Sequence, residues 1–395
     1  MGYVGLGFMA TAWMTTVWIG TDMFLPALPT MVEELSASQT LVNMIIFVYE
    51  IALAIGALIG GSISDRLGRR VPMLNGAAMF SFFTLLGALV SDIWVLLVAR
   101  AISGFGGGVI CAAVMAILKD EMGEGPQLDK AVTLSQSFVA VGPIVAPFVG
   151  SLMLGMTGWH GIFLVLAGFS FVLGVWYAFQ PESLPIEKRA KVSIIRSLGL
   201  VFDVAKNKSF TVFLFMAAMP VLGVGVFIAT SSYIIIEDFG LDTFGYSVCY
   251  GIAGLVSVSA PFVYLWLSRH FSSKRMGFAI CSIFLISALL VLGIGPLGIV
   301  LLVLSLVPFY LAEGMMRPYA CLVLLRAEKE HTGSASALIN FALNLFCALG
   351  VPVASIPLWG GHYGSFAWPL IILAVISFAT YLFLIFAMKS EIVKD

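Results

Sequence analysis

Charged residues are scarce in this chain. Only 10% of its 395 residues are Asp, Glu, Lys or Arg, whereas 61% are hydrophobic and the mean hydropathy is +1.07. A soluble domain usually carries about 25% charged residues, so lipid must be the solvent for most of this chain. The formal net charge of −1 gives no electrostatic reason to expect a nucleic-acid partner, and we expect none.

Sequence patterns for metal binding and enzyme catalysis are also missing. The five cysteines form no CxxC pair and the four histidines do not cluster, so we expect neither a disulfide framework nor a metal site. The chain contains no HExxH, GxSxG or Walker loop, which argues against an enzyme and against direct drive by ATP. We therefore expect no cofactor.

Long apolar runs are abundant instead. About 20 apolar residues are needed for a helix to cross the hydrocarbon layer. No basic stretch precedes the first run, so we expect that run to be retained as a helix rather than cleaved as a signal peptide. The sequence thus predicts an all-α integral membrane protein with twelve transmembrane helices. They lie near residues 4–29, 41–63, 72–90, 93–118, 131–156, 160–180, 209–236, 245–267, 277–294, 297–325, 334–358 and 366–388.

The basic residues indicate the orientation of these segments, because Lys and Arg concentrate in cytoplasmic loops. All but two of the 20 Lys and Arg residues follow an even-numbered segment, and the exceptions, Arg100 and Arg317, lie inside segments. Acidic residues alone occupy the other side, at Glu33, Glu34, Asp92, Glu237, Asp238 and Asp242. We therefore expect both termini in the cytoplasm and a multi-pass protein of the cell inner (plasma) membrane.

The longest polar stretch divides the predicted helices into two groups of six. This stretch, residues 181–208, is expected to be a cytoplasmic linker between bundles at 1–180 and 209–395. Two bundles that rock about a central site are typical of secondary transporters.

Three segments carry patterned glycine, proline and charge. Residues 61–70 read GSISDRLGRR, where glycines permit a tight turn and an Asp flanked by arginines invites ion pairs at a helix end. The residues of this pattern are Gly61, Asp65, Arg66, Gly68, Arg69 and Arg70. Around residue 100 the chain reads LxxxRxxSGxGGG. The fifth segment carries Gly142, Pro143, Ala146, Pro147 and Gly150.

These patterns resemble the signatures of the major facilitator superfamily. The 61–70 pattern is similar to the superfamily's loop signature, in which the Asp, the later Arg and an acid after helix 4 form a cytoplasmic gate latch; Asp65, Arg69 and Asp120 match those places. The pattern around Arg100 resembles the second signature, with Ser103 in place of the usual Gln. The fifth-segment pattern resembles the third signature, which marks antiporters.

Residues 22–29, DMFLPALP, resemble the Bcr/CflA branch of bicyclomycin and chloramphenicol resistance proteins. The resemblance covers the first half well, whereas the second half rests mainly on hydropathy. It implies efflux of small, mostly apolar compounds in exchange for protons.

Ionisable residues inside the bilayer are functional candidates because burying charge there is costly. Asp22, Glu50 and Arg100 are predicted to lie about 10–14 Å below the outer helix ends, at 1.5 Å per residue. We expect them to couple transport to protons, with Asp22 the leading carrier, Glu50 the second and Arg100 their partner. The alternative is a static buried cluster that only orders the helices.

Further polar residues are candidates for a substrate cavity. Glu313 and Arg317 are spaced to share a helix face, and a structural salt bridge is the better interpretation, with a role in the gate or substrate path as the alternative. Asn43 and Tyr49, together with Asn340 and Asn344, are expected to line the cavity, and interhelical hydrogen bonding is the alternative for the asparagine pair.

The predicted function is a proton-coupled secondary antiporter for multidrug efflux by alternating access. The alternative is a narrow-substrate exporter of a sugar, siderophore or other metabolite on the same fold; a membrane-embedded enzyme or receptor is disfavoured because no catalytic cluster is seen. The expected partners are a small-molecule substrate, protons and the lipid bilayer, and we expect a monomer.

Overall fold

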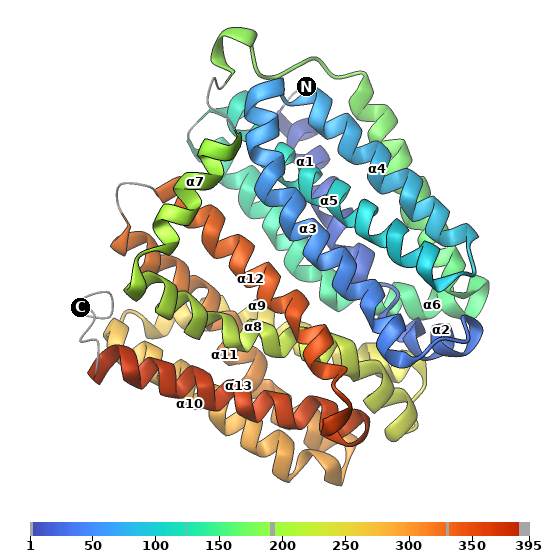
Figure 1. Ribbon diagram of the computed structural model, residues 1–395, viewed down its shortest axis with the longest axis vertical. Coiled ribbons are helices and arrows are strands. Elements are labelled where there is room, and N and C mark those ends of the chain that lie inside the picture. Colours follow the sequence, from blue (N-terminus) through green and yellow to red (C-terminus); the bar gives the residue numbers. More distant parts are fainter. Residues whose placement is uncertain (1–2, 124, 190–193, 329–331, 387–395) are drawn as a thin grey trace. The chain divides into compact units, whose positions relative to one another are not determined.

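A computed structural model describes residues 3–123, 125–189, 194–328 and 332–386, and these residues form helices joined by short turns (Figure 1). All twelve predicted apolar segments overlap helices. The helices of the first half are α1 (Tyr3–Asp22), η1 (Leu25–Ala27), α2 (Leu28–Glu34), α3 (Gln39–Leu67), α4 (Arg70–Leu89), α5 (Ile93–Met122), α6 (Pro126–Ala178), η2 (Ile186–Lys188) and α7 (Ile194–Ala205). Those of the second half are α8 (Lys208–Ser232), η3 (Tyr233–Asp238), α9 (Thr243–Leu267), α10 (Ser273–Gly293), η4 (Gly295–Leu297), α11 (Ile299–Ala327), α12 (Thr332–Ala354), η5 (Pro357–Trp359) and α13 (Gly361–Phe386).

The chain divides into two compact units, unit 1 (Met1–Arg196) and unit 2 (Ser197–Asp395). In unit 1, α3 and α4 pack on α5, while α1 and α4 pack on α6. In unit 2, α8 packs on α12 and α13, while α11 packs on α9 and α10. The division falls within α7, inside the stretch expected to be a linker.

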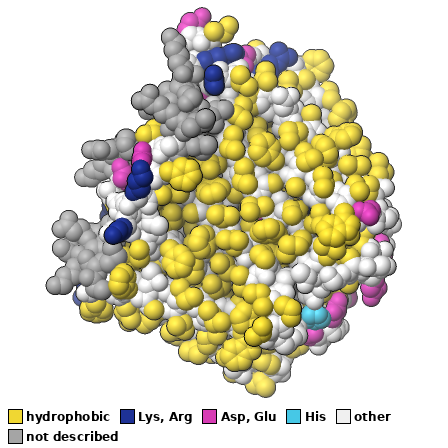
Figure 2. Space-filling model, viewed as in Figure 1, with side chains coloured by type: hydrophobic (Ala, Val, Ile, Leu, Met, Phe, Trp, Pro, Cys, Tyr) yellow, Lys and Arg dark blue, Asp and Glu magenta, His cyan; other side chains and the backbone are white. Residues whose placement is uncertain are grey.

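Ten helical stretches of the described residues are long and apolar enough to cross a membrane. One of them belongs to α6, which contains two of the predicted segments and is broken at Gly158 (φ 67°, ψ −177°). Large apolar side chains such as Leu89 and Phe262 are about 70% exposed, as expected for a surface in contact with lipid. Figure 2 shows a face covered mainly by hydrophobic side chains, with charged side chains near its margin. The count of twelve spans stays a prediction.

The first helix is shorter than predicted. The sequence predicts one helix over residues 4–29, but α1 ends at Asp22 and the chain continues as η1 and then α2. Pro26 has no amide hydrogen to donate to the carbonyl of Asp22, four residues earlier, and this favours the end of α1 there, whereas Pro29 lies in the first turn of α2, where a proline is tolerated. Asp22 therefore lies at the end of α1 rather than about two turns inside it.

Side-chain caps explain several helix starts. Ser38 accepts a hydrogen bond from the amide of Leu41 before α3, and Asp92 accepts from the amides of Trp94 and Val95 before α5. These oxygens satisfy amides that have no partner in the first turn.

Glycines set the closest helix contacts of unit 1. A Cβ at Gly104 of α5 would overlap the carbonyl of Tyr49 in α3, and a Cβ at Gly150 of α6 would overlap the carbonyl of Met23 at the end of α1. Only glycine permits this approach. The two contacts bring α3 against α5, and α6 against the break after α1, around one buried region.

Candidate functional site

Arg100 of α5 lies in that region and is only 1% exposed. Its guanidinium carbon is 3.8 Å from the ring centroid of Tyr49, 5.0 Å from that of Phe24 and 5.6 Å from that of Phe163. We call Phe24, Tyr49 and Phe163 the aromatic cage. The cage residues come from the break after α1, from α3 and from the later part of α6, so three elements hold one cation.

The cage leaves part of the guanidinium without an acceptor. The Nε and Nη2 atoms of Arg100 are buried and have no hydrogen-bond partner among the described residues. Cation–π contact contributes about 2 kcal/mol in a desolvated site, whereas a buried unpaired donor costs about 1–3 kcal/mol or more when charged. Arg100 is therefore ready to bind an acceptor that enters the site.

The two predicted proton carriers lie close to this cation. The Thr21 hydroxyl donates to Oε1 of Glu50 over 3.0 Å. Glu50 follows Tyr49 of the cage, and Asp22, which is 9% exposed, follows Thr21. The structure thus brings Asp22, Glu50 and Arg100 into one neighbourhood, but Nε and Nη2 of Arg100 bind neither acid. Their role in proton coupling stays a prediction.

The predicted cavity residues of unit 1 are buried. Tyr49 is fully buried and its hydroxyl donates to the carbonyl of Val17 over 2.6 Å, while Asn43 is 2% exposed. In unit 2, Asn340 is exposed and donates to the carbonyl of Ser336 in its own helix, and Asn344 is half-buried. Tyr49 orients Arg100 in this structure, and the assignment of these residues to a substrate cavity stays a prediction.

Glu313 and Arg317 form the expected pair on α11. The Arg317 Nε lies 2.7 Å from Oε1 of Glu313, and the Ser257 hydroxyl of α9 donates to Oε2 over 3.2 Å. Glu313 is 3% exposed, whereas the Arg317 side chain is 46% exposed. The glutamate joins α11 to α9, and the choice between a structural and a transport role stays open.

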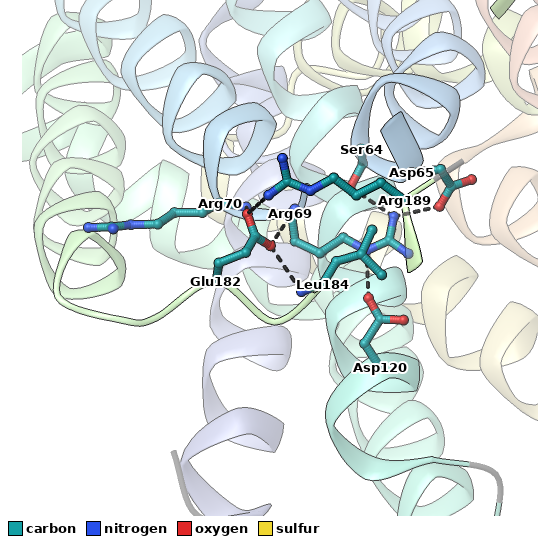
Figure 3. Close-up of polar contacts among 8 residues, drawn as sticks. All are labelled: Ser64, Asp65, Arg69, Arg70, Asp120, Glu182, Leu184 and Arg189. Carbon is teal, nitrogen blue, oxygen red and sulfur yellow. Dashed lines mark hydrogen bonds and ion pairs between the residues drawn. The ribbon is translucent and has the colours of Figure 1, made fainter. Parts of the chain in front are cut away.

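A second cluster surrounds the loop between α3 and α4 (Figure 3). Arg69 is 6% exposed; its Nη1 donates to Oδ1 of Asp65 over 2.5 Å and to the Ser64 hydroxyl over 3.2 Å, and its Nε donates to Oδ2 of Asp120 over 2.6 Å. We call Ser64, Asp65, Arg69 and Asp120 the motif-loop cluster. Burial alone would lower the pKa of the Arg69 guanidinium, but the hydrogen bonds to Asp120 and Asp65 raise it overall. The cluster therefore ties the start of α4 to the ends of α3 and α5.

The other residues of the 61–70 pattern have varied surroundings. Arg66 is exposed, and a Cβ at Gly61 would contact nothing within 4 Å. Gly68 has φ +94°, a conformation that favours glycine. The Arg70 guanidinium donates to the carbonyl of Ala178 at the end of α6 over 2.7 Å.

The fifth-segment pattern lies within α6 where α6 packs on α1. Pro143 and Pro147 are inside the helix, Ala146 is 1% exposed, and a Cβ at Gly142 would meet Ile19 at 3.5 Å. Gly142 and Gly150 of this pattern lie where α6 meets the end of α1, next to Asp22.

Sequence reasoning missed three partners of the charged residues: Phe24, Phe163 and Glu182. Phe24 belongs to the DMFLPALP pattern, which gives no reason to place it beside Arg100, and Phe163 is one of 31 phenylalanines and carries no distinguishing signal. Glu182 accepts backbone hydrogen bonds from Arg69 and Arg70, although more than 100 residues separate it from both (Figure 3). The only sequence signal for the contact of Glu182 with the start of α4 is its place in the polar stretch, close to the end of a predicted helix.

Similarity to known proteins agrees with this architecture. The Major Facilitator Superfamily model matches residues 11–351. The chain is 29% identical to the MFS-type transporter YdgK of Bacillus subtilis (strain 168), over 86% of this chain and 85% of the relative. It is 28% identical to Multidrug resistance protein D of Escherichia coli (strain K12), over 82% of this chain and 81% of the relative.

Solved structures share the fold at low sequence identity. A crystal structure of a mutant of the nucleoside transporter NupG has a TM-score of 0.77 at 16% identity, covering 98% of this chain and 100% of that chain. A D-xylose-proton symporter has a TM-score of 0.71 at 16% identity, covering 97% of each chain. Since the family model spans most of the sequence, this protein belongs to the Major Facilitator Superfamily and is a multi-pass membrane transporter.

Proposed function

We propose that the protein is a proton-coupled antiporter of the cell inner membrane that exports small, mostly hydrophobic compounds. Relatives named multidrug resistance proteins support the efflux of drugs. The observation that carries the proton coupling is Arg100, a buried cation with two unused donors beside two ionisable acids.

Arg100 gives the acids two alternative states. In this structure the Glu50 carboxyl is bound by the Thr21 hydroxyl, and the nearby guanidinium has donors to spare. Loss of a proton from Glu50 or Asp22 creates a carboxylate that Arg100 can bind, and proton uptake releases the guanidinium again. Substrate binding is coupled to proton release if both require the same acid in its charged form.

The motif-loop cluster is proposed to act as a cytoplasmic gate. Arg69 bridges Asp65 of α3 and Asp120 of α5, so these helix ends can separate only after one of these two charge-assisted hydrogen bonds breaks. The cluster thus favours one state of the cycle, and substrate and proton binding supply the free energy that opens it.

The test uses the full-length protein in proteoliposomes that contain a pH-sensitive dye, with ethidium as the transported probe. Ethidium should drive proton movement in the opposite direction, and Asp22→Asn or Glu50→Gln should abolish this movement at equal protein content. The matched control is Glu33→Gln, an exposed acid of α2, which should behave as wild type. Unchanged coupling in both Asp22→Asn and Glu50→Gln would remove these acids from the mechanism.

The breadth of substrates is tested separately by overexpression in a drug-sensitive host. Protection against several unrelated hydrophobic compounds supports multidrug efflux. Protection against none of them, together with export of a single metabolite, would replace it by the narrow-substrate exporter.

A further inference from the structure

The start of α4 is capped by a residue that follows α6. The first amides of a helix have no partner within it and are usually capped by a neighbouring Ser, Thr, Asp or Asn. Arg69 occupies the N-cap position of α4, and its side chain caps none of these amides. Glu182 does so instead: its Oε1 accepts from the Arg69 amide over 2.7 Å and its Oε2 from the Arg70 amide over 3.3 Å.

Both oxygens of Glu182 also have partners in the polar stretch that contains Glu182. Oε1 accepts from the Leu184 amide over 3.1 Å, and Oε2 lies 3.6 Å from Nη2 of Arg189. Burial alone would raise the pKa of the Glu182 carboxyl, but the bonds from the Leu184, Arg69 and Arg70 amides, with the Arg189 guanidinium, hold it below its usual value. The carboxylate is therefore a charged junction between the polar stretch and the loop before α4.

Residues on both sides of the contact between α4 and the segment after α6 contribute hydrogen bonds to it. The Arg70 guanidinium reaches back to the Ala178 carbonyl at the end of α6, while Glu182 reaches forward to the start of α4. A Cβ at Gly68 would collide with the Glu182 carboxylate and the Arg189 guanidinium, so the glycine is required by this contact as well as by its positive φ. Figure 3 shows Glu182 on one side of Arg69 and Asp120 on the other.

We propose that Glu182 is a positioning residue of the motif-loop cluster. By holding the Arg69 amide, the carboxylate fixes the backbone from which the Arg69 side chain reaches Asp65 and Asp120. Withdrawal of the segment Glu182–Arg189 from the start of α4 then loosens the ion pairs at the ends of α3 and α5. The segment that follows α6 in unit 1 is in this way a controlling element of the gate, an inference that rests on the proposed gate function.

The test is amide hydrogen exchange of the full-length protein in lipid nanodiscs. In Glu182→Gln, exchange at the first turn of α4 should rise roughly fivefold, as expected for the loss of a helix cap. Exchange at the last turn of α5, residues 118–122, should rise too, because Asp120 loses a firmly held Arg69. The matched control is Glu187→Gln, an exposed acid in the same stretch, which should leave both segments unchanged.

A merely local cap gives a different result. If Glu182→Gln raises exchange in α4 but not at the end of α5, Glu182 stabilises one helix start and the proposal is wrong. Should Glu182→Gln fail to fold, Arg189→Gln is the second variant, because it removes only the 3.6 Å ion pair. It is expected to raise exchange at the start of α4 and at the end of α5 by a smaller factor. Unchanged exchange at the end of α5 in Arg189→Gln would also overturn the proposal. Exchange requires no transported substrate, so this result does not depend on whether protons and ethidium are exchanged.

Measurement of ethidium efflux then tests whether the motif-loop cluster acts as the gate. Glu182→Gln should slow efflux several-fold, and combining it with Asp120→Asn should add little, because both changes act through Arg69. Fully additive effects would show that Glu182 acts elsewhere. If efflux persists in Glu182→Gln at the wild-type rate while exchange at α5 rises, Glu182 positions the cluster but the cluster is not the gate.

Discussion

Arg100 is held by aromatic faces, and this explains how a charged side chain persists in an apolar bundle. A guanidinium is planar and weakly hydrated, so it stacks on rings while its edge keeps its hydrogen-bond donors. The Tyr49 hydroxyl donates to Val17, so the ring nearest the cation is itself held in place. The donors of Arg100, rather than a fixed ion pair, are the feature available to a moving carboxylate.

Substitutions at these two positions should therefore separate charge from stacking. Arg100→Lys keeps the charge but replaces the flat guanidinium by a compact ammonium, and we expect the rate of ethidium-driven proton release to fall roughly tenfold, the equivalent of one to two kcal/mol of cation–π contact. Tyr49→Phe keeps the ring and should retain coupling within about twofold, at a cost of about 1 kcal/mol in stability from the lost hydroxyl bond. Dye-reported proton release and thermal unfolding in detergent measure the two effects. Full coupling in Arg100→Lys would contradict the stacked arrangement.

The charged residues of the site could be found from the sequence, but their uncharged partners could not. Asp22, Glu50 and Arg100 stand out because charge is rare in apolar segments, and GSISDRLGRR identifies its own loop. Phe163 and Thr21 are ordinary residues of a membrane helix, and only the fold brings them to Arg100 and Glu50. Contacts between distant segments leave no periodic signal in a single sequence.

At the scale of elements, helix positions follow from local chemistry where a cap or a proline acts. Asp92 and Asp242 begin helices because their carboxylates accept the first free amides, whereas Pro26 favours the early end of α1. The hydropathy pattern overlooked the early end of α1 because the residues that follow the break, 23–28, are apolar. That break places Phe24 against Arg100, so the least predictable stretch of the first helix is part of the site.

The packing of α6 on α1 should depend on a single glycine. Gly150→Ala places a methyl group against the Met23 carbonyl and should destabilise the protein by about 1–3 kcal/mol through overpacking. Gly155→Ala in the same helix meets nothing within 4 Å and should be neutral or stabilising by up to about 1 kcal/mol. Thermal unfolding of the two variants in one detergent makes the comparison. Equal unfolding temperatures would show that α1 and α6 are not in close contact.

The Glu182 contact should weaken on acidification. Because its pKa is lower in the folded protein, the carboxylate stabilises the contact at neutral pH, and this contribution is lost as pH falls through the lowered value. The groups facing it are the Leu184, Arg69 and Arg70 amides, the Arg189 guanidinium and the Tyr177 phenol. Exchange protection at the start of α4, corrected for intrinsic rates, should fall in the wild type as the pH drops through the lowered pKa of Glu182, and be flat in Glu182→Gln. A decline of the same size in Glu182→Gln would assign the effect to another acid.

At the scale of the whole molecule, the two units repeat one packing scheme. In unit 1 the first long helix, α1, packs on α6 and α3 packs on α5; in unit 2 α8 packs on α12 and α9 packs on α11. Glycine permits the approach in each: Gly150 meets Met23 in unit 1, and Gly225 meets the Cys347 carbonyl in unit 2. The charges are not repeated in the same way, because the caged Arg100 belongs to unit 1 and the Glu313–Arg317 pair to unit 2. Under the proposed function, unit 1 is where the coupling chemistry lies.

This asymmetry sets the expected energetics of transport. One buried cation can balance one carboxylate, so of Asp22 and Glu50 one is expected to be ionised beside Arg100 while the other carries the exchangeable proton. A gradient of one pH unit supplies about 1.4 kcal/mol per proton, which supports about a tenfold concentration ratio of substrate at zero membrane potential. Ethidium accumulation in proteoliposomes, with the potential clamped by potassium and valinomycin, should therefore level off near tenfold per pH unit and vanish when the pH gradient is collapsed. A plateau near a hundredfold would mean that both acids release their protons in each cycle, and that Arg100 does not hold one of them charged.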